Sequence, residues 1–248
     1  MKLHKINPKF TSEGNPRIGL ITLGSDFRIE KDFNNVIHGK NIDLFINRIH
    51  CYNPLTNETL AKMANDITDV TKEILPNEKL DCVAYGCTSG TVAAGYDIVK
   101  KNINLAKPEA KVTTPITSAV KVLKKLDIKN ISVFTPYTKP INQSIVDYFK
   151  KSGINIKELH YFDIASDIDI GKVDKDYLFK VLSNLNLDES EALFISCTAL
   201  PALDLIDKLE KKFNKLVLSS NQTLIWEALN LVGNKETVKG YGKIFEIN

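Results

Sequence analysis

The sequence predicts an α/β fold with two pseudo-symmetric lobes, each a four-stranded parallel sheet flanked by helices. Short apolar runs alternate with helical patterns, and this alternation begins again halfway along the chain. Residues 81–101 align with residues 191–211 at a constant offset of 110, which places Cys87 on Cys197 and Thr88 on Thr198. Residues 17–22 similarly align with residues 130–135 at an offset of 113. We interpret these matches as an internal duplication.

The first half of the chain shows the alternation clearly. The predicted helix at residues 57–75 is an example: apolar residues recur at helical spacing from Leu60 to Ile74, and Pro76 ends the pattern. Residues 23–35 are interpreted as a loop that shapes the pocket. The predicted strands are residues 17–22, 42–49, 81–85 and 111–113, and the predicted helices are residues 57–75, 91–101 and 117–126.

The second half repeats the pattern, with Gly153 and Gly233 each placed just after a predicted helix. Residues 137–142 are interpreted as a second pocket loop. We predict lobes at residues 1–127 and 128–248, with residues 222–248 packing back on the first lobe. The predicted strands are residues 130–135, 155–162, 191–196 and 215–218, and the predicted helices are residues 142–152, 174–184, 201–213 and 222–232.

Composition excludes several classes of protein. The 248 residues are 43% apolar and 25% charged, as in an ordinary globular domain. The net charge, 33 basic minus 30 acidic residues, is only +3, so we expect no nucleic-acid or membrane partner. The polar N-terminus has no signal peptide, which predicts a cytoplasmic protein. No Cys-x-x-Cys pair, Walker lysine or Gly-x-Gly-x-x-Gly motif occurs, so we expect neither a metal nor a cofactor.

Two Cys-Thr pairs are the main candidates for chemistry. Cys87-Thr88 and Cys197-Thr198 each follow a buried strand, at the edge where ligands of parallel sheets bind. A helix is predicted to begin there, and its free N–H groups would lower the thiol pKa. With the strand ends facing each other across a cleft, one thiol could take a proton from a substrate carbon and the other return one. We therefore predict Cys87 and Cys197 as catalytic.

Other polar groups of these turns would complete the site. Thr88, Ser89 and Thr198 supply hydroxyls, and we expect them to hold a substrate carboxylate and stabilise an enediolate-like intermediate. Cys51 and Cys82 are interpreted as small buried hydrophobes.

The chain also resembles a known family along most of its length. It is similar to the aspartate/glutamate racemase superfamily, and more closely to the branch of maleate cis–trans isomerases, arylmalonate decarboxylase and ectoine-utilisation protein A. This resemblance implies a cofactor-independent enzyme in which Cys87 is the nucleophile, Cys197 handles a proton and Tyr137 is the active-site tyrosine. The residues that carry it are Gly19-Leu20-Ile21, Ser25-Asp26, Arg48-Ile49, Asn53-Pro54, Tyr85 to Gly90, Thr135-Pro136-Tyr137, Ser196-Cys197-Thr198 and Ser219 to Gln222.

Two departures from the family pattern bear on the substrate. Asp26 falls where the family carries asparagine, and it could act as a base or bind a cationic group. It would repel a second substrate carboxylate by about 4 kcal/mol at ~4 Å and an effective dielectric constant of 20, which disfavours a dianion such as maleate. Arylmalonate decarboxylase has glycine at the first cysteine position, so Cys87 favours a racemase or isomerase. Ala199 after the second Cys-Thr pair is unlike the amino-acid racemases.

Three hypotheses follow. The first is a cofactor-independent racemase or isomerase of a small carboxylate, either maleate-like or derived from ectoine. The second uses the same site for an arylmalonate-type decarboxylase or a lyase, and the third is a non-catalytic protein that binds a small carboxylate. A homodimer or higher homo-oligomer is the default expectation for such a fold.

Overall fold

Two parallel four-stranded sheets form the framework of the protein. The computed structural model describes residues 1–11 and 14–247. Sheet A has the strand order β2-β1-β3-β4 and sheet B the order β6-β5-β7-β8, so the second half repeats the topology of the first. The predicted fold class is confirmed. The strands are β1 Arg17–Leu23, β2 Asp43–Ile49, β3 Cys82–Gly86, β4 Lys111–Thr113, β5 Asn130–Thr135, β6 Asn155–Tyr161, β7 Ala192–Ile195 and β8 Leu216–Ser219.

The register places equivalent strands at the centre of each sheet. Ile18 of β1 lies opposite Leu44 of β2 and Cys82 of β3. In sheet B, Ile131 of β5 lies opposite Ile156 of β6 and Ala192 of β7. All residues of β3 and β7 are buried, as expected for parallel strands covered by helices on both faces. Their carboxyl ends lead directly towards the two Cys-Thr pairs.

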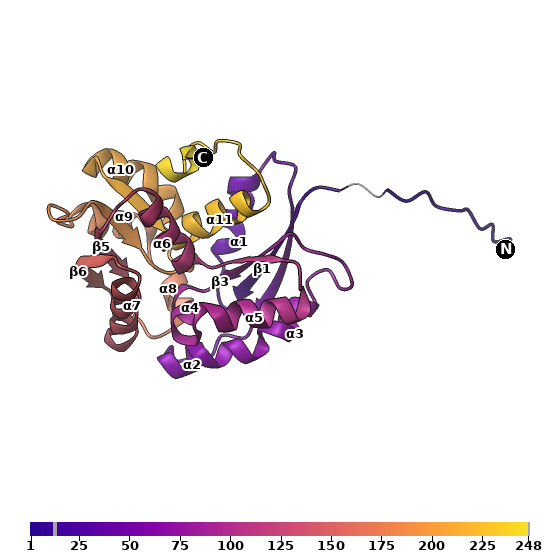
Figure 1. Cartoon of the computed structure of the whole chain (residues 1–248), viewed down its shortest axis with the longest axis horizontal. Helices are drawn as coiled ribbons and strands as arrows, with labels where there is room; N and C mark the ends of the chain where they lie inside the picture. Colours follow the sequence, from indigo (N-terminus) through magenta and orange to yellow (C-terminus); the bar gives the residue numbers. More distant parts are fainter. Residues whose placement is uncertain (12–13, 248) are drawn as a thin grey trace.

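Helices cover both faces of sheet A. Figure 1 shows α2, α3, α4 and α5 on one side of its strands and α1 and α11 on the other. Residues 57–75 form α2, a 3-10 turn at Met63–Asp66 and α3 rather than one helix. The predicted helix at residues 91–101 is interrupted at Gly95, whose φ of +88° ends one helix before the next begins. The helices are α1 Ile29–Ile37, α2 Asn57–Lys62, α3 Ile67–Lys72, α4 Thr88–Ala94, α5 Tyr96–Ala106 and α6 Pro115–Lys125.

Two segments interpreted as loops are partly helical. Residues 29–37 form α1, which buries Ile29, Phe33, Val36 and Ile37 on one face. Residue 139 begins α7, earlier than the predicted residue 142. Conversely, α10 begins only at Ile206, after a 3-10 turn at Leu203–Leu205, whereas a helix was expected from residue 201.

The helices of the second half end with α11, which is buried from Ser220 to Leu229 and packs against α6, β3, β4 and α1. The division into lobes at residue 127 stays a prediction. Residues 1–11 are exposed and extend away from the body of the protein (Figure 1). In the described ranges, no helix has both the length and the apolar character that a bilayer span needs. The remaining elements are α7 Lys139–Lys151, α8 Asp167–Gly171, α9 Lys175–Ser183, α10 Ile206–Phe213, α11 Ser220–Leu231 and a 3-10 turn at Lys243–Glu246.

Candidate active site

Cys87 lies at the junction between β3 and α4, where its side chain caps the helix. Its Sγ accepts a hydrogen bond from the Gly90 N–H at 3.2 Å, and the residue is 3% exposed. A Cβ at position 90 would lie 2.7 Å from this sulfur and 3.0 Å from the Tyr85 hydroxyl. Glycine is therefore needed at position 90 because the thiol packs directly on its Cα.

Cys197 is positioned in a different way. It lies two residues beyond β7 and has a φ of +103°, a backbone conformation that costs a non-glycine residue about 1–3 kcal/mol. Its N–H donates to the Ser220 hydroxyl at 2.9 Å, which helps to hold this conformation. No helix begins at residue 198, so the expectation that a helix follows both cysteines is correct for Cys87 and wrong for Cys197.

Burial favours the protonated form of both thiols. It raises the pKa of Cys87 far above the ordinary value, and the Gly90 N–H opposes this only partly. Burial also raises the pKa of Cys197, the charge of Asp167 raises it further, and the Ala199 N–H and Tyr137 hydroxyl work in the opposite direction. The expected lowering of the thiol pKa by N–H groups is therefore present but outweighed by desolvation.

A buried tyrosine is hydrogen-bonded to each thiol. Tyr85 pairs with Cys87, and Tyr137 pairs with Cys197. Burial, and then the charges of Cys197 and Cys87, raise the pKa of Tyr137, which places this phenol beside both thiols. The structure thus places Tyr137 near both cysteines, and its role in the site stays a prediction. Tyr85 was not predicted as a site residue, although its position two residues before Cys87 at a strand end was an available signal.

Hydroxyl groups join the two Cys-Thr turns. The Ser220 hydroxyl that receives the Cys197 N–H also pairs with the Thr88 hydroxyl at 2.8 Å. The Thr198 hydroxyl donates to the Gly86 carbonyl at 3.2 Å, so it would have to release Gly86 before donating to a substrate. Ser89 is buried, and its side chain lowers the pKa of Cys87. The structure therefore brings Thr88, Ser89 and Thr198 together, and their contact with a substrate stays a prediction.

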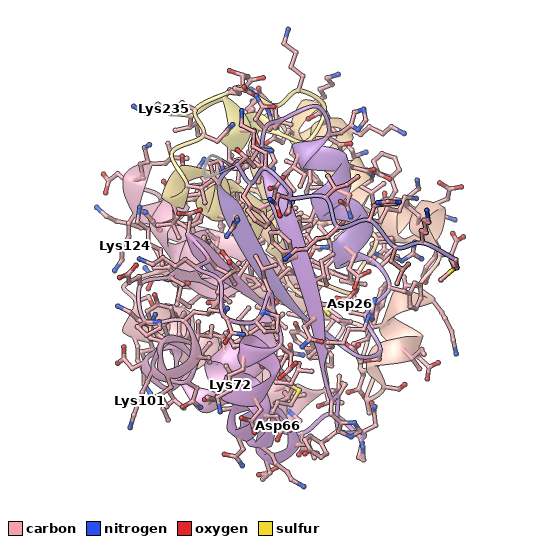
Figure 2. All side chains as sticks on the ribbon, turned by 90° about the vertical axis from the view of Figure 1, so that its right-hand side faces the viewer. Asp26, Asp66, Lys72, Lys101, Lys124 and Lys235 are labelled. Carbon is pink, nitrogen blue, oxygen red and sulfur yellow. The ribbon has the colours of Figure 1, made fainter. Side chains whose placement is uncertain are left out.

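Asp26 lies in the interior, whereas Lys101, Lys124 and Lys235 lie at the surface (Figure 2). Its Oδ1 accepts hydrogen bonds from the N–H groups of Arg28 and Ile29 at 2.7 and 3.1 Å, at the start of α1. Its Oδ2 is buried and has no hydrogen-bond partner in the described part of the chain. Burial raises the pKa of Asp26, against the effect of the two N–H groups.

Asp167, the first residue of α8, is a second carboxyl in the site, and sequence reasoning missed it. Its Oδ2 accepts a hydrogen bond from the Ser25 hydroxyl at 2.5 Å, across 142 positions of the sequence. Burial raises the pKa of Asp167 to about 6, and the charge of Asp26 adds to this. The charge of Asp167 in turn raises the pKa of Cys51, Cys87 and Cys197, so this carboxyl lies among three thiols.

The loops around Asp167 close the site. The Leu55 N–H donates to the Ala165 carbonyl at 2.8 Å, and the Arg28 guanidinium donates to the Gly171 carbonyl at 2.8 and 3.2 Å. A Cβ at Gly171 would meet the Phe27 ring at 2.6 Å, so these segments are in close contact. An open hollow of about 610 Å³ adjoins them and is lined by residues 53–54, 163–166 and 169.

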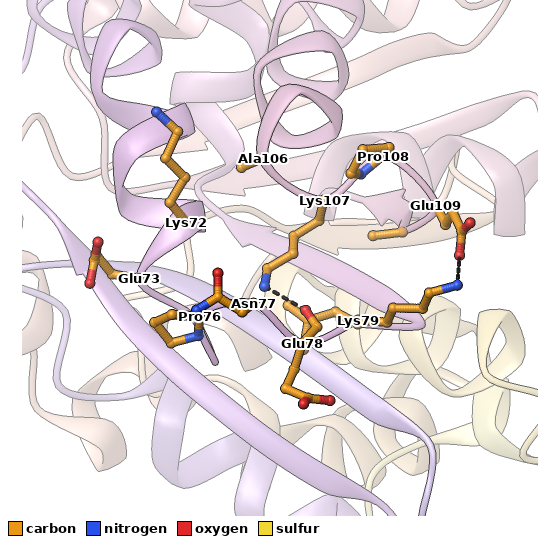
Figure 3. A pocket seen from close by; sticks show the side chains of 12 residues that line it. Lys72, Glu73, Pro76, Asn77, Glu78, Lys79, Ala106, Lys107, Pro108 and Glu109 are labelled. Atoms are coloured by element: carbon orange, nitrogen blue, oxygen red, sulfur yellow. Dashed lines mark hydrogen bonds and ion pairs between the residues drawn. The ribbon is translucent and has the colours of Figure 1, made fainter.

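A different hollow, of about 510 Å³, lies near the amino ends of β3 and β4 (Figure 3). Lys107 lines it and donates to the carbonyls of Leu75 and Glu78 at 2.9 and 2.7 Å. Ligands of parallel sheets bind at the opposite, carboxyl ends, where Cys87 lies. We therefore assign Lys107 a structural role. Over the described residues, no group of three or more His, Cys, Asp or Glu side chains is arranged to hold a metal ion.

The comparisons with known proteins agree with this geometry. The profile of the arylmalonate decarboxylase family matches residues 53–245. The chain belongs to this family. The resemblance inferred from its motifs is confirmed.

Several members of the family are similar over much of their length. The maleate isomerase of Alcaligenes faecalis is 25% identical over 178 residues, which cover 68% of this chain and 70% of the relative. That of Nocardia farcinica is 23% identical over 239 residues, covering 92% and 94%. The arylmalonate decarboxylase of Bordetella bronchiseptica is 23% identical over 137 residues, covering 54% and 57%.

Solved structures show the same fold. A Nocardia farcinica maleate cis-trans isomerase mutant with a covalently bound succinylcysteine intermediate superimposes with a TM-score of 0.86 at 21% identity, covering 95% of this chain and 100% of that one. Unliganded arylmalonate decarboxylase superimposes with a TM-score of 0.74 at 18% identity, covering 94% and 100%.

Proposed function

We propose that the protein is a cofactor-independent isomerase or racemase of a small carboxylate, with Cys87 and Cys197 as its catalytic thiols. The observation that carries this proposal is the joining of the two Cys-Thr turns through Ser220, with a tyrosine on each thiol. Relatives named maleate isomerase support an isomerase. The succinylcysteine intermediate of the Nocardia farcinica enzyme shows that a cysteine of that protein bonds to a substrate carbon.

Two related reactions fit these thiols. In both reactions Cys87 first gives its S–H proton to water. In a racemisation, the resulting thiolate takes the proton from the α-carbon, and the C–H electron pair moves into the carboxylate to give an enediolate. The Cys197 thiol then returns a proton to the opposite face of the carbon. In an isomerisation, the Cys87 thiolate adds to one alkene carbon and the Cys197 thiol protonates the other. Rotation about the resulting single bond and reversal of both steps gives the other geometric isomer.

The remaining predicted residues would hold the substrate. Thr88, Ser89, Tyr137 and Thr198 would bind its carboxylate and stabilise the charge that develops there, while Asp26 lies beside the thiols. This assignment rests on their burial next to Cys87 and Cys197. The substrate could be maleate-like or derived from ectoine.

The decarboxylase or lyase alternative rests on the family name and on the Bordetella bronchiseptica relative. A decarboxylase needs one thiol to reprotonate the carbon after CO2 leaves, whereas this site holds two, which favours the isomerase. A non-catalytic binding protein would use the same turns without thiol chemistry. We further propose a cytoplasmic homodimer or higher homo-oligomer without nucleic-acid or membrane partners, in line with the small net charge of +3.

The test is NMR spectroscopy in D2O with maleate, aspartate, glutamate, hydroxyectoine and phenylmalonate. Deuterium entering next to a carboxylate, or maleate becoming fumarate, is expected with the wild type and should fall by about 10²–10⁴ in Cys87→Ser and in Cys197→Ser. Cys82→Ala, at the amino end of β3, is the matched control and should retain activity. Loss of CO2 that needs only Cys197 would establish the decarboxylase. Ligand binding without turnover that survives both serine substitutions would establish a binding protein.

A further inference from the structure

The candidate site holds two buried carboxyls. The charge of Arg48 lowers the pKa of Asp26, but the ion pair of this guanidinium is with Glu30. None of the ion pairs in residues 1–11 and 14–247 involves Asp26 or Asp167. Arg48 donates to the main-chain carbonyl of Asp26 at 2.8 Å and to the Glu30 carboxylate at 2.6 Å. Arg28 donates to the Gly171 carbonyl. Both guanidinium groups are therefore directed at other acceptors.

Asp26 presents an unused acceptor to the site. Two main-chain N–H groups hold Oδ1, so the carboxyl is fixed in orientation, and Oδ2 is buried without a partner. An unpaired buried acceptor is costly, and a ligand that donates a hydrogen bond to it recovers that cost. The nearby Thr198 hydroxyl lowers the pKa of Asp26, but it donates its hydrogen bond to the Gly86 carbonyl, and Oδ2 has no partner in the described residues.

A positive charge near the thiols would favour their deprotonation. Deprotonating Cys87 or Cys197 adds a negative charge near Asp167, which already raises the pKa of both thiols. A substrate with two carboxylates and no cationic group adds still more negative charge to a desolvated site, where like charges repel strongly. A cationic nitrogen on the substrate would offset the carboxyls and make the thiolate accessible.

On the basis of the proposed function, we infer that the substrate is a zwitterion, with a carboxylate and a cationic nitrogen on or next to the reacting carbon. Asp26 Oδ2 and the Asp167 carboxylate accept hydrogen bonds from that nitrogen. Simple dicarboxylates that lack it bind poorly. The two carboxyls thus determine which substrates reach the thiols.

The inference is tested by calorimetric binding to pairs that share a carbon skeleton: alanine against propionate, aspartate against succinate, and glutamate against glutarate. At least one amino acid should bind the wild type about tenfold or more tightly than its partner without nitrogen. Asp26→Asn and Asp167→Asn should each remove most of this preference. Asparagine keeps an oxygen that can cap α1 or accept from Ser25, so both variants should fold, which thermal melting verifies. Asp169→Asn removes a half-exposed carboxylate two residues away and is the matched control.

Failure to bind any amino acid, equal binding within every pair, or a preference unchanged in both asparagine variants would overturn the inference. The same samples are followed in D2O, which separates this inference from the proposed function. Conversion of maleate with no binding of amino acids would support the proposed isomerase function and contradict the inference of a zwitterionic substrate. Preferential binding of the amino acids with no proton exchange or isomerisation would support the inference of a zwitterionic substrate and contradict the proposed isomerase function.

Discussion

The two halves of the chain have the same strand order and some equivalent hydrogen bonds. Each sheet has the same strand order, and each has a lysine that fixes the loop before its third strand. Lys107 donates to two carbonyls of residues 75–78, and Lys215 donates to two carbonyls of residues 187–190. The duplicated halves therefore retain the contacts that position β3 and β7.

At the thiols the two halves differ. Cys87 has ordinary extended dihedrals and caps α4, whereas Cys197 has a positive φ and is held by Ser220. Tyr137 lowers the pKa of Cys197, while Gly90 and Ser89 lower that of Cys87. The repeated fold places a cysteine after the third strand of each half, but the hydrogen bonds of Cys87 and Cys197 differ. We therefore expect that the two thiols would not be interchangeable in the proposed reaction.

The largest expected effect is on activity and comes from Gly90→Ala. The new Cβ would lie 2.7 Å from the Cys87 sulfur and push it out of place, which should lower kcat/KM by about 100-fold or more. The equivalent position in the second half is the buried Leu200. Leu200→Ala should instead cost about 2–5 kcal/mol of stability, with activity per folded molecule retained. Steady-state kinetics measure the effect. Full activity of Gly90→Ala would show that the position of the Cys87 sulfur does not depend on glycine at position 90.

A second prediction compares the buried carboxyls of the two halves through stability against pH. Burial raises the pKa of Asp32, on α1, to about 7, and that of Asp167 to about 6, from 3.8. Between the unfolded and folded pKa values, each of these carboxyls binds more protons in the folded state than in the unfolded state. The contribution of each carboxyl to the free energy of unfolding is therefore greatest in acid and falls as the pH rises. From pH 5 to 8, Asp32 should cost about 3 kcal/mol and Asp167 about 1 kcal/mol.

Urea unfolding at pH 5 and pH 8 checks this. Asp32→Asn should remove more of the pH dependence than Asp167→Asn, because only the ionised carboxylate carries the desolvation cost. Identical slopes for both variants and the wild type would show that these carboxyls titrate normally.

The smallest predicted effect is the difference between Tyr137→Phe and Tyr85→Phe in the pKa of the neighbouring thiol. Tyr137→Phe removes a hydrogen bond that lowers the pKa of Cys197, so this pKa should rise and the thiol should become a weaker acid. Activity at neutral pH should fall about fivefold, as the loss of a hydrogen bond of about 1 kcal/mol implies. Tyr85→Phe should change Cys87 less, because Gly90 and Ser89 still bond to that thiol. Alkylation rates against pH, resolved by residue in single-cysteine-to-serine backgrounds, measure both. A larger effect at Tyr85 would reverse the comparison.

The sequence carried most of the fold because the alternation and the duplication depend on local patterns. Apolar runs locate the strands, and the offset of 110 relates Cys87 to Cys197. Residues 29–37 had a helical signal in Ile29, Phe33 and Val36, but the segment was interpreted as a pocket loop. The break at Gly95 was missed because apolar spacing alone does not reveal a residue with positive φ.

The site was less accessible to sequence reasoning because it depends on contacts between distant segments. Asp167 lies in a polar stretch that looks like a solvated turn, and only the fold brings it to Ser25 and the thiols. The positive φ of Cys197 has no local signal, since neither its neighbours nor its type favours that conformation. Ser220 belonged to a motif noticed in the sequence, but its bond to Cys197 crosses from one strand end to the next.

The position of α11 has a consequence for how the protein is made. This helix lies near the end of the chain, yet it covers α6, β3 and β4 of the first half. During synthesis the strands of sheet A leave the ribosome long before the helix that covers them, so an apolar surface stays open until α11 has been made. The first half therefore cannot complete its folding before α11 is synthesised, and removal of α11 would uncover parts of both sheets at once.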